Sequence, residues 1–570
     1  MPGFRITNLH SDVPLNNFDN TRCKTDVIEF EDWKINRNTL NKFLDDKVFF
    51  EFNDHIVVLE GVIYNACHIR ETLGKQSFLD AVEILVRQPT KQFIQSLDGA
   101  CSGAIIYKKE KRVVVFTSVL GEKSIFFTDY QGKFIIGSQL NYITDIMRHK
   151  NIVRIPNETA ISQFLAYGFY LDDSTCIEGV KRLYPGTYLE IKNGNLTVQE
   201  YNKIEYSQIY DYPEKRLIQM LQTAFLNAMK KIVNKNAEYG YCNLINISGG
   251  ADSRMIACAV KKINCPNVLL NCYGESGCDD ARISEQIAHI LGYPYIFRST
   301  DNADCMMHID ENIQMNNGAT IYYGITGGKA MLEMLNQESF GLEITGLLGD
   351  IFDGSMVVTY SEGKIDENYT RFRCSKVMEY GKDFIFPKSE NGRFKKNENE
   401  LYWFHARGML FGMTSYFIRQ NFVEVATPFG DSDFLKIYLS IPWNIRVKQK
   451  LLRKWFVQEY PFAASLKYAN TGTSLKSTLN WWGWYLEKWQ VLKRKLTISF
   501  LNRPLGMNDI RYWYNSNKQF SEYISSYYLD TINVVEGDIK EKIERLYKSP
   551  IISDRLLAVT VLAIYKNYVK

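Results

Sequence analysis

A Ser-Gly-Gly-Ala-Asp-Ser segment at 248–253 follows a short apolar run, 244–247, and precedes a second apolar run at helical spacing, 255–260. This order predicts a strand that passes through a tight glycine turn into a helix, with backbone N–H groups pointing beyond the helix start. Gly249 and Gly250 let the backbone approach a ligand closely, and the hydroxyls of Ser248 and Ser253 add donors. The segment therefore indicates an anion site, although a strand-turn-helix joint without a ligand has the same pattern.

The carboxylate of Asp252 changes this interpretation. Beside a phosphate it is repulsive, by about 4 kcal/mol per charge pair at about 4 Å and an effective dielectric of about 20. A divalent cation must therefore bridge the two. The spacing fits neither Gly-x-x-x-x-Gly-Lys-Ser/Thr nor Gly-x-Gly-x-x-Gly. Ser-Gly-Gly-x-Asp-Ser after a strand instead resembles the signature of the ATP pyrophosphatases. That resemblance implies ATP and Mg²⁺ as cofactors, and cleavage between the α- and β-phosphates.

Length and composition limit the class of protein. With 570 residues, 45% hydrophobic and 23% charged, the chain has the size and composition of two or three globular domains. A net charge of +4 without a long Lys/Arg run predicts no nucleic-acid partner. The eleven cysteines include no Cys-x-x-Cys pair, which favours buried thiols in a reducing cytoplasm. The longest apolar run, 556–565, is half a membrane span, so we expect a soluble cytoplasmic protein without a membrane partner.

The first 205 residues have the pattern of a sheet-rich domain. The segment 108–111 is polar and predicts a hairpin tip between two strands, and 78–86 predicts an amphipathic helix. Apolar residues alternate along four stretches: 56–64, 103–107, 112–116 and 134–137.

Four segments in this region, 61–65, 97–99, 120–123 and 179–189, resemble successive landmarks of the N-terminal glutamine amidotransferase domain of asparagine synthetases. The resemblance implies an αββα sandwich of the N-terminal-nucleophile type over residues 1–205. In that family the mature chain begins with a catalytic cysteine, but here the second residue is Pro2. Proline has neither a thiol nor a primary α-amine, so we expect the fold to be kept and the glutaminase activity to be lost.

Beyond residue 206, helical and strand patterns alternate. An apolar helix pattern over 217–232 leads to the strand before Ser248, and a second strand is predicted at 267–272. A helix at 280–291, capped by Gly292, then precedes a strand at 295–297. This alternation implies a mostly parallel sheet, whose ligands bind at the carboxyl ends of the strands. Gly274 follows the second strand, where it allows the backbone to approach adenine or is an ordinary loop glycine.

A second strand end carries Gly346 and Asp350, within Thr-Gly-Leu-Leu-Gly-Asp at 345–350. This segment resembles Thr-Gly-x-Gly-Ser-Asp of asparagine synthetases, which implies that Asp350 joins Asp252 in holding Mg²⁺ and pyrophosphate. Asp353 is the alternative carboxylate. Leu347 stands where asparagine synthetases have Glu and β-lactam synthetase has Tyr, and leucine cannot transfer a proton.

Three further residues are candidates for catalysis. The segment 422–431 resembles Val-Glu-Ala-Arg-Val-Pro-Phe-Leu-Asp of the family, which implies that Glu424 serves as a base or binds the amine. The segment 448–453 resembles Lys-x-x-Leu-Arg but has Gln449 at the lysine position. Lys450 or Lys467 could therefore stabilise the departing pyrophosphate, although a solvated surface position is the default for each.

The sequence thus predicts an α/β and α+β protein: an amidotransferase-like domain at 1–205, then an α/β ATP-pyrophosphatase domain at 206–570 with an insertion near 355–410 and an aromatic C-terminal tail. The resemblance implies an AMP-forming carbon–nitrogen ligase that joins a carboxylate to ammonia or an amine, as in asparagine biosynthesis. One alternative, favoured by Leu347 and Pro2, is amidation or cyclisation of a specialised carboxylate in a polysaccharide or peptide pathway. Another is a catalytically weak nucleotide-binding scaffold. The sequence does not decide the oligomeric state, for which a homodimer is one alternative.

Overall fold

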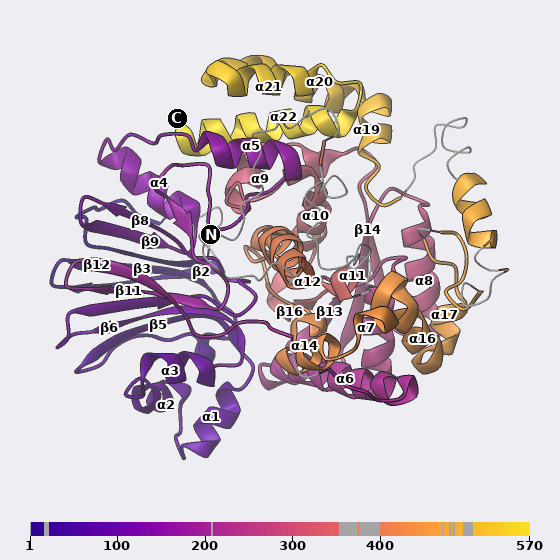
Figure 1. Ribbon diagram of the computed structural model, residues 1–570, viewed down its shortest axis with the longest axis horizontal. Helices are drawn as coiled ribbons and strands as arrows, with labels where there is room; N and C mark the ends of the chain where they lie inside the picture. The colour runs from indigo at the N-terminus through magenta and orange to yellow at the C-terminus, as the bar shows by residue number, and fades with distance from the viewer. Residues whose placement is uncertain are drawn as a thin grey trace.

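The computed structural model describes residues 2–15, 22–206, 209–352, 374–375, 399–469, 471–477, 482, 485–493 and 506–570. Its first part holds two antiparallel sheets (Figure 1). The first sheet has the order β10 (Lys181–Arg182), β8 (Phe126–Tyr130), β9 (Lys133–Gly137), β1 (Gly3–Thr7), β3 (Trp33–Leu40), β2 (Cys23–Phe30). The second has the order β12 (Asn195–Glu200), β11 (Thr187–Lys192), β7 (Arg112–Phe116), β6 (Gly99–Tyr107), β5 (His55–Ile63), β4 (Phe49–Glu51).

Side-chain alternation along the strands builds four layers from these sheets. In β5, Ile56 and Val58 face the core between the sheets, whereas Val57 and Leu59 face the helices outside. Those helices are α1 (Ala66–Thr72), α2 (Phe78–Leu85) and α3 (Thr90–Ser96), and α4 (Leu140–His149) and α5 (Glu158–Tyr167) lie beyond the other sheet. The expected αββα sandwich is confirmed.

Local predictions in this domain agree with the structure. The hairpin tip at 108–111 joins β6 to β7, and the N–H of Lys111 donates to the carbonyl of Lys108 at 3.4 Å. The helix expected at 78–86 is α2, which begins with a capping box between Ser77 and Asp80. After β12 the chain continues into α6 (Glu214–Glu238), and the division at residue 205 stays a prediction.

The second part is built on a parallel five-stranded sheet. Its order is β15 (Tyr295–Ser299), β14 (Val268–Gly274), β13 (Cys242–Asn246), β16 (Phe340–Ile344), β17 (Glu424–Ala426). The chain runs outward from β13 in one direction, then returns to add β16 on its other side. The strand order therefore reverses between β13 and β16, and such a switch point is where open α/β sheets bind ligands.

Helices cover both faces of this sheet because its central strands are apolar on both sides. Ile245 of β13 packs with the cluster that contains α6, α7 (Ala251–Lys262) and α8 (Asp279–Leu291). Its neighbour Leu244 packs on the opposite face, against residues of α9 (Ile309–Met315), α10 (Thr326–Met334) and α13 (Thr414–Arg419). The predicted cap of α8 is confirmed, since Gly292 ends that helix with φ 70°.

The remaining helices close the molecule around the sheet. In the described residues after β16, the chain forms α11 (Gly349–Phe352), α12 (Asn399–Trp403), the π-helix η7 (Phe404–Gly412), the 3₁₀ turn η8 (Pro428–Gly430) and α14 (Ser432–Leu439). α15 (Trp443–Arg446), α16 (Lys450–Glu459) and α17 (Pro461–Ser465) come next. Residues 353–373 and 376–398, which contain Asp353 and most of the expected insertion, lie outside the described residues.

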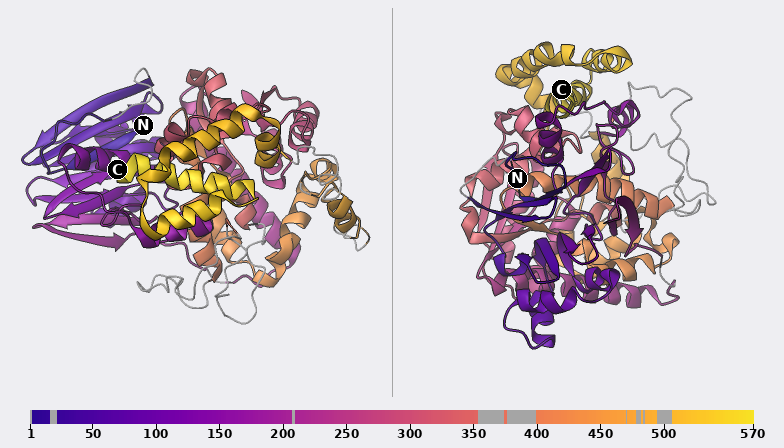
Figure 2. Two further views of the ribbon diagram at one scale, coloured as in Figure 1. Left: turned by 90° about the horizontal axis from the view of Figure 1, so that it is seen from above. Right: turned by 90° about the vertical axis from the view of Figure 1, so that its left-hand side faces the viewer.

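The last helices form a layer over α5 and α9, seen from above in Figure 2. They are α19 (Ile510–Ser516), α20 (Lys518–Thr531), α21 (Gly537–Tyr547) and α22 (Ile552–Ile564). Trp513 is buried, and its indole N–H donates to the Glu275 carboxylate at 2.6 Å, just after β14. Trp513 of the aromatic tail therefore contributes core packing, whereas Trp482 and Trp489 are exposed. Within the described part of the chain, no helix is long and apolar enough to cross a membrane.

Candidate functional site

The loop between β13 and α7 is held by its own serines. The Ser253 hydroxyl accepts from the N–H of Ser248 at 3.0 Å, and the two serine hydroxyls lie 3.0 Å apart. The N–H of Gly250 donates to the Ser248 hydroxyl at 3.2 Å. Gly250 caps α7 without a side-chain hydrogen bond, so the first-turn N–H groups of this 12-residue helix are the donors that an anion would meet.

Asp280, in the first turn of α8, reaches this loop. Its Oδ1 accepts from the N–H of Gly249 at 2.9 Å. The Asp280 carboxylate therefore already accepts from the Gly249 N–H, one of the backbone donors expected to bind a ligand. A phosphate that bound the same N–H would displace Asp280 or be repelled by it.

Arg254 lies beneath the loop and fixes its backbone. The side chain is fully buried, and its NH2 donates to the carbonyl of Gly249 at 2.6 Å and to the carbonyl of Lys467. NH1 donates to the carbonyl of Ala463 at 3.2 Å. Burial lowers the pKa of Arg254 to about 10, which leaves it charged at neutral pH. The Arg254 guanidinium therefore links the loop to α17 and to the residues that follow it.

The loop after β16 touches the loop after β13. A Cβ added to Gly346 would lie 2.9 Å from the backbone nitrogen of Ser253 and 3.1 Å from the Cβ of Asp252. One added to Gly349 would overlap the Asp252 side chain. Glycine at both positions is what lets the second loop pack on Asp252. The structure thus brings together Asp252, Gly346 and the start of α11, where Asp350 lies exposed.

Arg407 of η7 is a cation close to this second loop. Burial lowers the pKa of Arg407, and the negative charge of Asp350 opposes that effect, so the two side chains act on each other. The Arg407 guanidinium also stacks 3.8 Å from the centroid of Phe411. No sequence pattern points to Arg407, because this residue lies in the expected insertion.

The residues present fit a magnesium nucleotide in part. Among the described residues, no group of three or more His, Cys, Asp or Glu side chains is placed to hold a metal by itself. Mg²⁺, however, is commonly held by one or two carboxylates together with substrate phosphates and water. Asp252, Asp350 and the α7 N-terminus offer that donor set.

Glu424 lies in a different environment from the expected one. Its carboxylate is 1% exposed and bridges Lys123 at 2.7 Å and Lys47 at 3.0 Å. Burial alone would raise its pKa, but the two lysines outweigh burial and lower the pKa to about 2. Such a group is a weak base at neutral pH, which argues against the expected catalytic role. Lys47 also pairs with Glu60 at 3.3 Å, so the cluster ties β17 to the first domain.

The other predicted site residues are Gly274, Lys467 and Lys450. Gly274 ends β14 with φ 150°, and a Cβ there would lie 2.6 Å from the Cβ of Met507, so the C-terminal chain covers the place expected for adenine. Lys467 contacts the loop region through its backbone carbonyl, while its side chain is exposed. Lys450 is exposed at the start of α16. Among the residues that the structure describes, no contact of either lysine side chain supports a role in catalysis.

Arg254 and Asp280 were not predicted as site residues, but each has a recognisable sequence context. Arg254 interrupts an otherwise apolar helix face directly after the glycine turn, which is typical of a buried charge with a dedicated partner. Asp280 starts the helix after the neighbouring strand, and carboxyl ends of adjacent parallel strands meet at one edge.

At the start of the chain, Pro2 is buried and its carbonyl accepts from Nε2 of Gln139 at 3.0 Å. The backbone of β1 continues from it into the sandwich core through Phe4 and Ile6. A proline at this position therefore fills a structural place without offering a nucleophile.

Comparison with known proteins identifies the first domain. Residues 48–202 match the family model of the glutamine amidotransferase domain. No curated protein sequence matches the chain. Among solved structures, glutamine phosphoribosylpyrophosphate amidotransferase from B. subtilis, complexed with ADP and GMP, is 10% identical, with a TM-score of 0.22 over 47% of this chain and 77% of that chain. A structure of the allosteric regulatory enzyme of purine biosynthesis is 10% identical, with a TM-score of 0.24 over 52% of this chain and 74% of that chain. The family match covers the sheets of the sandwich from β4 to β12, and the chain therefore contains an N-terminal glutamine amidotransferase-like domain.

Proposed function

We propose that this protein is an ATP-dependent ligase that activates a carboxylate and joins it to an amine or ammonia. The observation that carries the proposal is the contact between the two loops at the switch point, where Gly346 and Gly349 pack against Asp252 and Ser253. The amidotransferase-like domain supports amide chemistry in general. Activation by ATP is the part that rests on the loops.

The proposed reaction has two balanced steps. A carboxylate oxygen forms a bond to the α-phosphorus of ATP, and the bond from that phosphorus to the bridging oxygen breaks, so that pyrophosphate leaves. The amine nitrogen then attacks the activated acyl carbon, AMP leaves with the oxygen, and the nitrogen loses a proton to solvent. The sum is carboxylate plus amine plus ATP giving amide, AMP and pyrophosphate.

The chain's own residues have separate tasks in this proposal. The α7 N-terminus and the Ser248 hydroxyl bind the pyrophosphate end. Asp252 and Asp350 would hold Mg²⁺, which when bound neutralises phosphate charge as a Lewis acid. Arg407, whose charge interacts with that of Asp350, would contact the departing pyrophosphate and would take the role that the sequence suggests for Lys450 or Lys467.

A second candidate is a nucleotide-binding scaffold with little catalysis. The hydrogen bond from the Gly249 N–H to Asp280 favours it, because that donor is already used. Leu347 favours it too, since its backbone is held by Thr345 and Thr427 and its side chain has no acid or base. The two candidates differ in whether ATP is cleaved.

Nucleotide products separate these candidates. The protein is incubated with Mg²⁺, ATP, ammonium and aspartate, then with a panel of other carboxylates and amines, and the nucleotides are separated by chromatography. AMP and pyrophosphate are expected with the correct carboxylate. Ser248→Ala combined with Asp252→Ala should abolish them, whereas Ser526→Ala with Asp530→Ala, an exposed Ser/Asp pair on α20, should not. ADP as the product rejects the mechanism, and no cleavage with any carboxylate favours the scaffold.

A further inference from the structure

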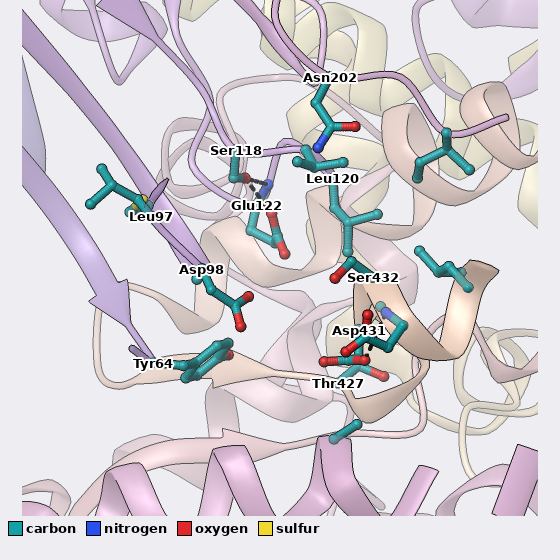
Figure 3. Close-up of a pocket in the computed structure, with 18 of the residues that line it drawn as sticks. Tyr64, Leu97, Asp98, Ser118, Leu120, Glu122, Asn202, Thr427, Asp431 and Ser432 are labelled. Atoms are coloured by element: carbon teal, nitrogen blue, oxygen red, sulfur yellow. Dashed lines mark hydrogen bonds between the residues drawn. The ribbon is translucent and has the colours of Figure 1, made fainter. Parts of the chain in front are cut away.

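A large cavity lies between the two domains. Its volume is about 590 Å³, within the range of roughly 300–1,000 Å³ typical of small-molecule sites. Residues of the amidotransferase-like domain form one wall, at the start of β6 and in the segment 118–122, and β17, η8 and α14 form the other. Figure 3 shows Asp98 and Glu122 on one side and Asp431 on the other, with their carboxylates directed to the same space.

The charge of this cavity is negative. Its lining contains five carboxylates and three lysines. Lys231 bridges Asp98 at 3.2 Å and Asp431 at 2.7 Å. Glu122 has no part in that bridge: its carboxylate accepts a hydrogen bond from the Ser118 hydroxyl, which in turn accepts from the Glu122 N–H. The carboxylates that line the cavity are Asp98, Glu122, Glu205, Asp431 and Asp433, and the lysines are Lys203, Lys231 and Lys436.

Burial makes the charge of Glu122 costly without a cation. Removal from water raises the pKa of Glu122, and the hydrogen bond from Ser118 and the nearby Lys123 oppose that effect only in part. Lys123 is itself 2.7 Å from Glu424. A positively charged ligand in the cavity would stabilise the ionised form of Glu122.

Part of the cavity lining is apolar and aromatic. Ile232 of α6, Val425 of β17 and Leu435 of α14 are buried and line it, together with Phe116. Tyr64, at the end of β5, and Tyr416, on α13, add ring surfaces that attract cations. The cavity thus offers carboxylates for a charged group and an apolar surface for a carbon skeleton.

One wall of the cavity is bonded directly to the loop after β16. The Tyr416 hydroxyl lies 2.9 Å from the Thr345 hydroxyl, and the Thr427 hydroxyl donates to the carbonyl of Leu347 at 2.7 Å. Tyr416 and Thr427 both line the cavity. A ligand there is therefore one layer of residues from the loop that carries Gly346 and Asp350.

We propose that this cavity binds a primary-amine cation with an apolar body, which is the nucleophile of the ligation. This inference rests on the proposed function for the role of the ligand, but not for its binding. A cavity of about 590 Å³ is larger than ammonia requires. Its carboxylates can bind an ammonium group, whereas the apolar side chain of Leu347 cannot. The amine cation gives one proton to Glu122, which lines the cavity, before attack, and the nitrogen loses its second proton to solvent after the acyl bond forms; Glu122 then returns its proton to solvent.

The test uses the full-length protein and three probes: n-butylammonium, its neutral counterpart n-butanol, and ammonium. Binding is measured by saturation-transfer NMR without ATP, so that it does not depend on nucleotide chemistry. We expect n-butylammonium to bind more tightly than either other probe. Glu122→Gln and, on the partly exposed wall, Asp98→Asn should each weaken its binding about tenfold through loss of a charge-assisted hydrogen bond. Glu83→Gln, an exposed carboxylate on α2, is the control.

The outcomes separate the two proposals. Equal binding of n-butanol, or binding that neither Glu122→Gln nor Asp98→Asn weakens, overturns the amine site. Amine binding that both variants weaken supports the site even if no AMP is ever formed, in which case the proposed ligase function fails alone. Formation of AMP without any amine binding here keeps the ligase function and overturns the site.

Discussion

The Glu424 carboxylate lies 2.7 Å from Nζ of Lys123 and is buried between the two domains. Glu424 belongs to the outermost strand of the parallel sheet, and Lys123 precedes β8 of the sandwich. Lys47, from the turn before β4, approaches the other carboxylate oxygen at 3.0 Å. A second buried pair, Lys235 of α6 with Asp46 at 2.8 Å, reinforces the same interface. The two domains are thus joined by ionised side chains that water does not reach.

Replacement of Glu424 by glutamine should destabilise the protein strongly. The amide keeps the shape but removes the counter-ion of Lys123 and leaves Lys47 with Glu60 as its remaining partner, and breaking a buried ion pair typically costs about 3–5 kcal/mol. Urea unfolding followed by fluorescence measures the loss. Glu51→Gln removes an exposed ion pair of equal length, Lys108–Glu51 at 2.7 Å, and should change stability by less than about 1 kcal/mol. Equal effects of the two substitutions would contradict a structural role for Glu424.

Acid should remove the contribution of Glu424 to stability. Its pKa in the folded protein is about 2, below the ordinary 4.5, so the stabilisation is present above pH about 4.5 and is lost as pH falls toward 2. The difference in unfolding free energy between wild type and Glu424→Gln should therefore shrink over that window. Unfolding of both proteins at several pH values between neutral and 2.5 measures it. A difference that grows on acidification is the opposite sign and excludes this assignment.

Glutamine should not be hydrolysed by this chain alone. Pro2 provides no thiol, and the buried thiol of Cys101 cannot replace it, because burial raises the pKa of Cys101 to about 12 and keeps it protonated. Incubation of the purified protein with glutamine should release no glutamate above the blank. Robust release that persists after a further purification step would show that another nucleophile acts in the amidotransferase-like domain.

Much of the fold could be predicted, since it depends on local periodicity. The short apolar run in 112–116 and a polar tip at 108–111 indicate a hairpin from local sequence alone, and β7 has the bounds of that run. The convergence of Asp252 with the loop at Gly349 could also be predicted, because parallel strands place their carboxyl ends at one edge. These features need no knowledge of distant partners.

Residues whose role depends on distant partners were not predictable in the same way. Nothing near Glu424 in the sequence indicates that Lys47 and Lys123 approach it from another domain. Nor does the pattern after β14 indicate that Met507 covers Gly274. A resemblance assigns such a residue the family's role, whereas the surrounding side chains determine its charge and its access to a ligand.

The effect of Asp280 on the loop after β13 provides the sharpest test of a phosphate site there. Its carboxylate accepts from the N–H of Gly249 at 2.9 Å. Asparagine at 280 keeps an acceptor for that N–H but removes the charge, so the fold should hold while repulsion of phosphate falls. We expect Asp280→Asn to tighten the binding of Mg·ATP or pyrophosphate, up to about tenfold, equivalent to about 1.4 kcal/mol. Asp279→Asn, the next residue on the same helix and paired with Arg282 at 2.6 Å, is the matched control and should leave binding unchanged. Calorimetric titration measures both variants. Weaker binding in Asp280→Asn would mean that the carboxylate helps to shape the site, and unchanged binding would mean that phosphate does not reach the Gly249 N–H.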